Sequence, residues 1–382
     1  MEKKIALVAP HIGTNYGTLL QAFSLAKVIN DLGYKCEYIS YTPYYKKTLW
    51  ERLCRKIKSF FKNNRTVATS VNEADDYSFW QKPEFAEIRK HADEFAKTKI
   101  PYSSIIYTPK TISRCNKYYN KFIVGSDQTW SMERYFVEDT FNYLSFVNKH
   151  GKKYSYASSL GTTRLTEQHR TILIKYLNDF ALLSCREKKN SDSLSELVGS
   201  PVELVLDPTM LFDKSFWLDF SEKIELPEKF VLAYILGNKE TVSEFAENIG
   251  KKHGLPVYYI LTHPYYINKK FVLRDLSIEQ WVYAIANASF VVTDSFHGTL
   301  FSVNLNKQFY SFSKRANNNS YLNDNDRILD FLETVSLTNR FVSDDNQKQL
   351  YDDTLIDYDV INLSVASLRD KSMSFLEKIM QS

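Results

Sequence analysis

The stretch "VVTDSFHGTLFSVN", residues 291–304, places polar residues, a histidine and a glycine between an apolar run and a segment with helical spacing. Two interpretations are open. In the first, Asp294 or Ser295 caps the helix, and His297 is a structural residue of its first turn. In the second, the turn binds a ligand, because a helix N-terminus attracts anions and an imidazole transfers protons near neutral pH.

Other apolar runs of the chain also end in small polar residues or glycine. These ends are Asn15-Tyr16-Gly17, Ser126-Asp127-Gln128, Ser158-Ser159-Leu160-Gly161, Cys185-Arg186-Glu187, Asp207-Pro208-Thr209 and Gly237-Asn238. In open α/β sheets, ligands bind at the carboxyl ends of the strands. We therefore expect these ends to converge on one cleft.

The elements that must position these ends alternate between strand and helix. Residues 4–10 and 36–41 read as strands, and the helical pattern between them, residues 18–33, stops at Gly33. A second strand–helix series begins near residue 228. Such alternation is typical of parallel sheets covered by helices. The sequence thus predicts an α/β fold with two Rossmann-like domains that face a cleft.

The length of 382 residues accommodates two domains. We place the N-terminal domain at residues 1–215 and the C-terminal domain at residues 216–382, with a closing helix over about 364–380. Residues from about 44 to 118 are basic, aromatic and poor in strand signals. They are interpreted as a helical, basic insertion in the first domain.

The insertion contains "KKTLWERLCRKIKSFFK", residues 46–62, which has one apolar stripe with basic residues on the remaining surface. Either the stripe packs on the core of this protein, or the helix lies in a membrane interface. The second interpretation predicts salt-dependent binding to anionic vesicles.

Composition excludes several classes of protein. Hydrophobic residues at 44% and charged residues at 25% are typical of a soluble globular protein, and a net charge of +4 is too small to indicate nucleic-acid binding. The four cysteines lie far apart and lack metal-ligand spacing, so we expect reduced thiols in the cytoplasm and no metal site. The start "MEKKIALVAPHIG" reads as a strand, not as a signal peptide, and no run reaches the ~18 apolar residues of a membrane span.

Six segments of the chain, in this order, resemble the polysaccharide pyruvyl transferase family. They are "NYGTLLQAFSLAKVINDLG", "FIVGSDQTW", "YSYASSLG", "SCREKKNSDSL", "LDPTMLF" and "VVTDSFHGTLFSVNLNKQF". The resemblance implies a glycosyltransferase-B-like arrangement in the cytoplasm or at the inner face of the membrane. It also implies transfer of a pyruvyl group from phosphoenolpyruvate, as a co-substrate without a further cofactor, to two hydroxyls of a sugar. That acceptor belongs to a polysaccharide, such as a capsule or exopolysaccharide, or to a lipid-linked oligosaccharide.

The resemblance also suggests roles for the strand-end residues. His297 is then a proton donor or a phosphate ligand, and Asp127 is a base for a sugar hydroxyl or a turn residue. The candidate donor-binding residues are Arg186, Gly237, Asn238, Asp294, Ser295, His297, Gly298 and Thr299. All of them except Arg186 lie in the second domain. The candidate acceptor-binding residues, in the first domain, are Asn15, Tyr16, Gly17, Gln21, Ser126 and Gln128.

One position departs from the family. Its histidine motif often reads Arg-Leu-His-Gly, whereas this chain has Ser295-Phe296-His297-Gly298. Arg186 is the main candidate for the donor's cation, and Arg274, Lys314 and Arg315 are candidates to replace the absent arginine. The departure leaves two other classes open: a glycosyltransferase that uses a nucleotide sugar, and a non-catalytic glycan-binding relative.

Overall fold

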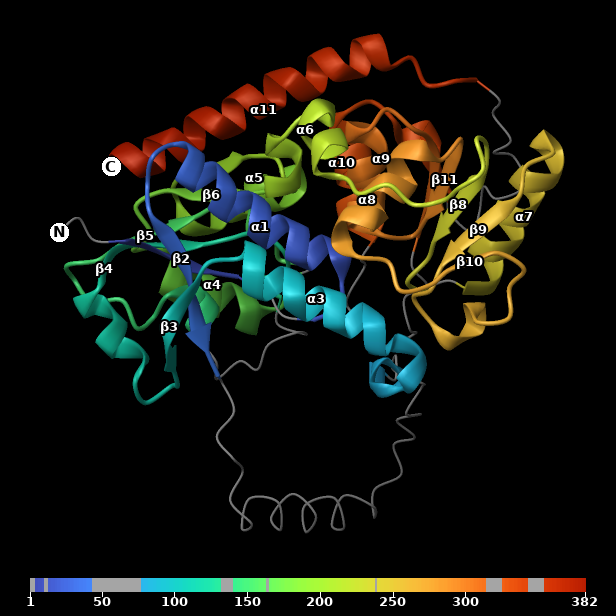
Figure 1. Ribbon diagram of the computed structural model, residues 1–382. Helices are drawn as coiled ribbons and strands as arrows, with labels where there is room; N and C mark the ends of the chain where they lie inside the picture. The colour runs from blue at the N-terminus through green and yellow to red at the C-terminus, as the bar shows by residue number, and fades with distance from the viewer. Residues whose placement is uncertain are drawn as a thin grey trace, which may run out of the picture.

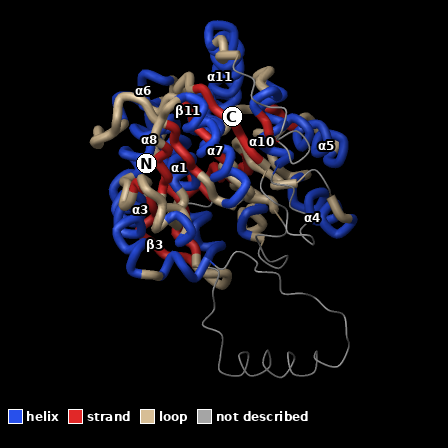
Figure 2. Tube along the Cα trace, turned by 90° about the vertical axis from the view of Figure 1, so that its right-hand side faces the viewer, coloured by secondary structure: helices blue, strands red, loops and turns tan. Residues whose placement is uncertain are grey.

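The computed structural model describes residues 4–9, 13–42, 77–131, 140–162, 165–237, 239–313, 325–342 and 354–382. It confirms the predicted α/β class: two parallel sheets lie side by side, each with helices on its faces (Figure 1). In the perpendicular view the strands lie inside and the helices outside (Figure 2).

The first sheet has the order β3-β2-β1-β4-β5. Its strands are β1 (Lys4–Val8), β2 (Cys36–Tyr41), β3 (Tyr102–Tyr107), β4 (Tyr119–Val124) and β5 (Lys152–Ser155). β6 (Leu183–Cys185) and β7 (Val202–Leu204) pair with each other and join β5 through bridges such as Tyr154–Leu182. All these pairings are parallel, so the carboxyl ends of the strands lie at one edge.

The helices around this sheet are α1 (Tyr16–Asp31), α3 (Ala86–Lys99), α4 (Glu167–Leu177) and α5 (Lys188–Val198). The short 3-10 turns are η1 (Tyr77–Gln81), η2 (Pro83–Phe85), η3 (Ile112–Lys117) and η4 (Phe141–Tyr143). α1 starts at Tyr16, earlier than the predicted residue 18, because the Asn15 side chain caps it by accepting a hydrogen bond from the Thr18 N–H at 3.2 Å. Most of α1 is buried, and it contacts α3, α8 and η5.

Residues 77–118 differ from the expected run of helices and loops. α3 crosses from β2 to β3, and β3 pairs in parallel with β2, so this region completes the first sheet. β3 gave no strand signal because it is an edge strand with consecutive exposed residues, among them Ile105 and Ile106. Without alternation of buried and exposed side chains, the period of two is lost. The basic helix predicted at residues 46–62 lies outside the described residues.

The second sheet has the order β10-β9-β8-β11-β12-β13. Its strands are β8 (Val231–Tyr234), β9 (Val257–Ile260), β10 (Val272–Leu273), β11 (Phe290–Thr293), β12 (Gln308–Phe312) and β13 (Phe341–Val342). The helices and turns are η5 (Pro208–Leu211), α6 (Lys214–Phe220), α7 (Lys239–His253), η6 (Pro264–Tyr266), α8 (Ile278–Asn287), α9 (Phe296–Asn304), α10 (Asn325–Thr334) and η7 (Thr338–Arg340). β11 lies in the centre of this sheet, so its carboxyl end and α9 are covered from both sides.

The last helix, α11 (Tyr358–Gln381), starts earlier than predicted and spans both halves of the molecule (Figure 1). Near its start, the Tyr358 hydroxyl donates to the backbone of α9 and its following turn. Near its end, Lys121 of β4 donates to the Ile379 carbonyl at 3.1 Å. A cation at a helix C-terminus is favourable, so Lys121 fixes the helix to the first sheet.

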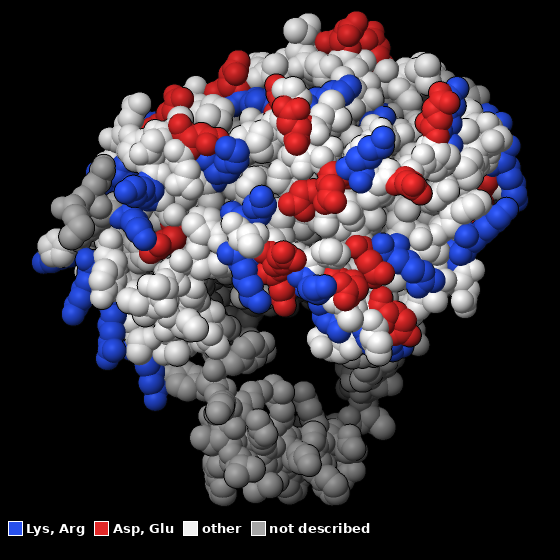
Figure 3. Space-filling view, in the orientation of Figure 1, with Lys and Arg blue, Asp and Glu red and all other residues white. Residues whose placement is uncertain are grey.

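The surface carries charges of both signs. On the face shown in Figure 3, basic and acidic side chains of the described residues are interspersed. Among the described residues, no helix is long and apolar enough to cross a membrane.

Candidate functional site

The predicted convergence of strand ends occurs between the two sheets. Asp127 follows β4, Arg186 and Glu187 follow β6, and Asp207 precedes η5. His297, in the first turn of α9, reaches this group from the second sheet. All five side chains are buried, so they form one polar cluster inside the protein.

Arg186 is the centre of this cluster. Its guanidinium lies 2.7 Å from Asp207 Oδ2, 3.3 Å from Glu187 Oε1 and 3.4 Å from Asp127 Oδ1. Burial alone would lower the pKa of Arg186, but the three carboxylates reverse this and raise it. The candidate donor cation is therefore engaged by the protein's own carboxylates in this structure.

Asp207 joins the two halves of the cluster. Its Oδ1 accepts hydrogen bonds from the Thr209 N–H and hydroxyl, and its Oδ2 accepts from Arg186 and from the Ser126 hydroxyl at 2.8 Å. Oδ2 also lies 3.7 Å from His297 Nε2. Burial alone would raise the pKa of Asp207, but His297, Arg186 and the Thr209 N–H hold it well below its ordinary value. Asp207 is thus a carboxylate at neutral pH, aimed at the imidazole.

His297 is packed tightly against the first turn of α1. A Cβ added to Gly17 would lie 2.1 Å from both Cγ and Nδ1 of His297. On the other side of the ring, Nε2 faces Asp207 and has no hydrogen-bond partner among the described residues. The imidazole therefore sits between α1 and Asp207, and only glycine at position 17 leaves it room.

We expect Gly17→Ala to destabilise the protein by about 1–3 kcal/mol, because the added methyl overpacks this contact. Without this contact, alanine in a helix would be more stable than glycine. A loss of stability in Gly17→Ala would therefore identify the contact with His297 as its cause. Urea unfolding measures it. In a His297→Ala background the same substitution should become neutral or stabilising. An equal loss of stability in both backgrounds would show that the added methyl group does not act through the imidazole of His297.

Asp127 has a left-handed backbone, with φ of 70°. Asp and Asn adopt this conformation more readily than most residues, and such positions are frequent at functional sites. One oxygen of its carboxylate accepts from the Gln128 N–H at 2.9 Å, and the other accepts from the Thr18 hydroxyl at 3.2 Å. Asp127 thereby connects β4 with the start of α1, on the same side as Gly17.

The donor-side candidates near α9 mostly build the turn. Asp294 accepts from the N–H groups of Leu236 and Gly237 at 2.6 and 2.7 Å, and Ser295 caps α9 through the Gly298 N–H. Thr299 is fully buried and bonds to Ser311. A Cβ at Gly298 would lie 2.5 Å from Thr293 Oγ1. These residues hold His297 in place, and Asn238 lies outside the described residues.

The acceptor-side candidates lie in different surroundings. Asn15 is exposed as the cap of α1, while Ser126 contacts Asp207 inside the cluster. Tyr16 is buried and stacks on Trp281 with ring centroids 5.4 Å apart, which joins α1 to α8. Gln21 and Gln128 are fully buried. The structure therefore places Tyr16, Gln21 and Gln128 in the packed interior.

Sequence reasoning did not single out Asp207, Glu187, Ser159, Phe296 or Arg327 as site residues. Ser159 donates to Glu187 at 2.6 Å, and the ring of Phe296 contacts the guanidinium groups of both arginines, Arg186 and Arg327. Asp207, Glu187 and Ser159 lie in the polar strand ends that were predicted to converge, but the sequence assigned them no role. Arg327 lies on α10, far from any motif, and had no such signal.

The other cations considered do not reach this cluster in the described part of the chain. Arg274 is exposed beyond the edge strand β10 and donates to the Ile267 carbonyl. Lys314 and Arg315 lie outside the described residues.

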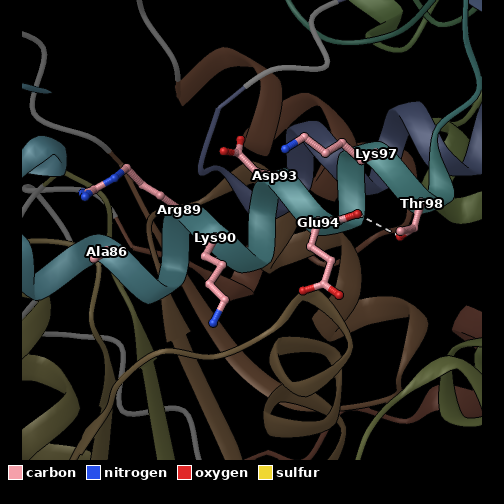
Figure 4. Close-up of a pocket in the computed structure, with 7 residues that line it drawn as sticks. All are labelled: Ala86, Arg89, Lys90, Asp93, Glu94, Lys97 and Thr98. Atoms are coloured by element: carbon pink, nitrogen blue, oxygen red, sulfur yellow. Dashed lines mark hydrogen bonds between the residues drawn. The ribbon is translucent and has the colours of Figure 1, made fainter.

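A hollow on the outer side of α3 is separate from the cluster (Figure 4). Its lining comes from this one helix: Ala86, Arg89, Lys90, Asp93, Glu94, Lys97 and Thr98. Charges of both signs lie along it, and Lys90 and Glu94 point away from Asp93. Nothing in this lining converges on a common point, so we place no ligand there.

Two Rossmann-like domains with a buried polar cluster between them define a glycosyltransferase-B-like protein. Solved structures agree: UDP-GlcNAc 2-epimerase from Methanocaldococcus jannaschii has a TM-score of 0.52 at 9% identity, with 99% of each chain covered. The S. aureus MnaA–UDP structure has a TM-score of 0.50 at 9% identity, with 95% of this chain and 91% of that chain covered. At this identity the likeness concerns the fold alone. A search of curated proteins finds no match.

The family model described as polysaccharide pyruvyl transferase matches residues 15–314. The chain belongs to the polysaccharide pyruvyl transferase family.

Proposed function

We propose that this protein transfers a pyruvyl group from phosphoenolpyruvate to two hydroxyls of one sugar in a polysaccharide or lipid-linked oligosaccharide. Family membership supports the reaction class. The observation that carries the proposal is the position of His297, which extends from the start of α9 to Asp207 across the domain interface. A histidine beside a carboxylate suits proton transfer, and the helix N-terminus suits an anionic donor.

The reaction needs a proton donor and a proton acceptor. A proton adds to the methylene carbon of phosphoenolpyruvate, which becomes the methyl group, and the neighbouring carbon becomes an oxocarbenium-like centre. The first sugar hydroxyl attacks this centre and loses its proton, which balances the proton taken up. The second hydroxyl then displaces phosphate, which leaves with the second proton, and the ketal closes.

Residues of the cluster fit these steps. His297 donates the proton or binds the phosphate, and the Asp207 carboxylate lies 3.7 Å from its Nε2. Asp127, at the end of β4, accepts the proton of a sugar hydroxyl. Because His297, Asp127 and Arg186 are buried, the proposal requires the interface around them to open when substrates enter.

The proposed acceptor also bears on where the protein acts. A lipid-linked acceptor would place the protein at the inner face of the cytoplasmic membrane, and the helix predicted over residues 46–62 would be its contact. That segment lies outside the described residues.

Thermal unfolding in the presence of phosphoenolpyruvate, inorganic phosphate or nucleotide sugars tests the donor without knowledge of the acceptor. A ligand at a hundred times its dissociation constant adds about 2.7 kcal/mol of stability. We expect phosphoenolpyruvate to stabilise the protein well beyond phosphate. Stabilisation by nucleotide sugars alone would contradict the proposal and favour a glycosyltransferase.

A further inference from the structure

Two guanidinium groups lie on the ring of Phe296, the residue before His297. Arg186, from the first sheet, has its Cζ 4.4 Å from the ring centroid, and Arg327, from α10, has its Cζ 5.3 Å away. Both arginines and Phe296 are buried. Cations from both halves of the molecule therefore meet beside the candidate catalytic histidine.

The carboxylates of the cluster surround Arg186. Arg186 is within 3.4 Å of Asp127, Glu187 and Asp207. One guanidinium cannot balance three buried carboxylates, so an anionic donor needs further positive charge at this place. Arg327 is close enough to act on the cluster, because its charge and that of Arg186 limit the rise that burial causes in the pKa of Glu187.

α10 is also fixed against the loop that carries Arg186. Asp330, three residues after Arg327, accepts from the N–H groups of Lys188 and Lys189 at 2.6 and 3.1 Å. Residues three apart share one face of a helix, so the contact that anchors α10 also directs Arg327 toward the cluster. Asp330 caps the first turn of α5, and α10 brings the guanidinium of Arg327 and the ring of Phe331 to Phe296.

We propose that Arg327 is a donor-binding residue of this site, and that it takes the place of the arginine absent at Ser295. This inference rests on the proposed function. The guanidinium binds the carboxylate or the phosphate of phosphoenolpyruvate, for which its planar fork of donors is suited. Phe296, where the family motif often has leucine, is the flat surface that holds both arginines in position.

Binding of phosphoenolpyruvate, measured by isothermal titration calorimetry on the full chain, tests this inference. Arg327→Met should weaken binding by about 30-fold, since hydrogen bonds to charged groups contribute about 1.5–3 kcal/mol. Arg327→Lys keeps the charge without the fork and should weaken binding by about fivefold. Circular dichroism and the unfolding midpoint check that each variant is folded. If Arg327→Met does not fold, the binding measured for Arg327→Lys decides the test.

Arg340→Met is the matched control. Arg340 is also buried, at the end of η7, and its guanidinium lies 5.6 Å from the ring centroid of Tyr310 in β12. This variant should lose stability but bind phosphoenolpyruvate within threefold of the wild type. Wild-type affinity in folded Arg327 variants would overturn the role of Arg327 and leave the proposed function intact. A wild-type protein that does not bind phosphoenolpyruvate would overturn both.

Discussion

Replacing His297 with alanine should reduce pyruvyl transfer by about a thousandfold, because a positioned general acid contributes about 10² to 10⁴ in rate. The imidazole is the ionisable group of α9 that reaches Asp207, with Nε2 3.7 Å from Oδ2. Release of phosphate from phosphoenolpyruvate, in the presence of an acceptor glycan panel, measures the rate. His297→Gln should be equally slow, since an amide does not transfer the proton.

His253→Ala is the control for this experiment. His253 ends α7 on the exposed surface and packs on Phe290, so its loss should leave phosphate release within twofold of the wild type. Phosphate release by His297→Ala at a tenth of the wild-type rate or more would show that His297 does not transfer the proton. Weakened binding of phosphoenolpyruvate with little change in turnover would instead assign His297 to the phosphate.

The sequence was sufficient to predict the class of fold and the end of each sheet at which the cluster forms. Apolar runs that stop at polar residues carry this information, because parallel strands place all their carboxyl ends at one edge. Arg186, Asp127 and His297 were found in this way. β3 was not, because an edge strand with exposed isoleucines lacks the alternation that marks a half-buried strand.

What the sequence could not predict depends on how the two sheets meet. The contact of Gly17 with His297 joins residues 280 positions apart, and nothing local to either residue signals it. The same holds for Arg327, which reaches Phe296 from α10, a helix that Asp330 ties to α5. Local patterns also left open whether Asp294 is a ligand or a cap, and the backbone contacts of Leu236 and Gly237 give it a structural role.

The largest loss of stability is expected for Arg186→Met, at about 3–5 kcal/mol near neutral pH. The guanidinium is fully buried, and its removal leaves Asp127, Glu187 and Asp207 without the cation that all three contact. Unpaired buried charges are far costlier than a missing ion pair. Arg170→Met is the matched control: Arg170 is half exposed and lies 3.7 Å from the exposed Glu167, so its loss should cost under about 0.5 kcal/mol.

The pH dependence of this loss separates charge from packing. In the wild type the pKa of Asp207 is held low, so its contribution to stability is present above the unfolded-state pKa, near 4, and is lost as the pH falls below it. Burial raises the pKa of Glu187, and Arg186 is the main group that limits this rise. In Arg186→Met the pKa of Glu187 therefore rises further, so the folded state takes up a proton first and regains stability on acidification. Urea unfolding at pH 7.5, 6 and 5 should therefore show a gap between wild type and variant that narrows toward low pH. A gap that stays constant would mean that Arg186 stabilises the protein through the packing of its side chain on Phe296, and that the carboxylates are satisfied without it.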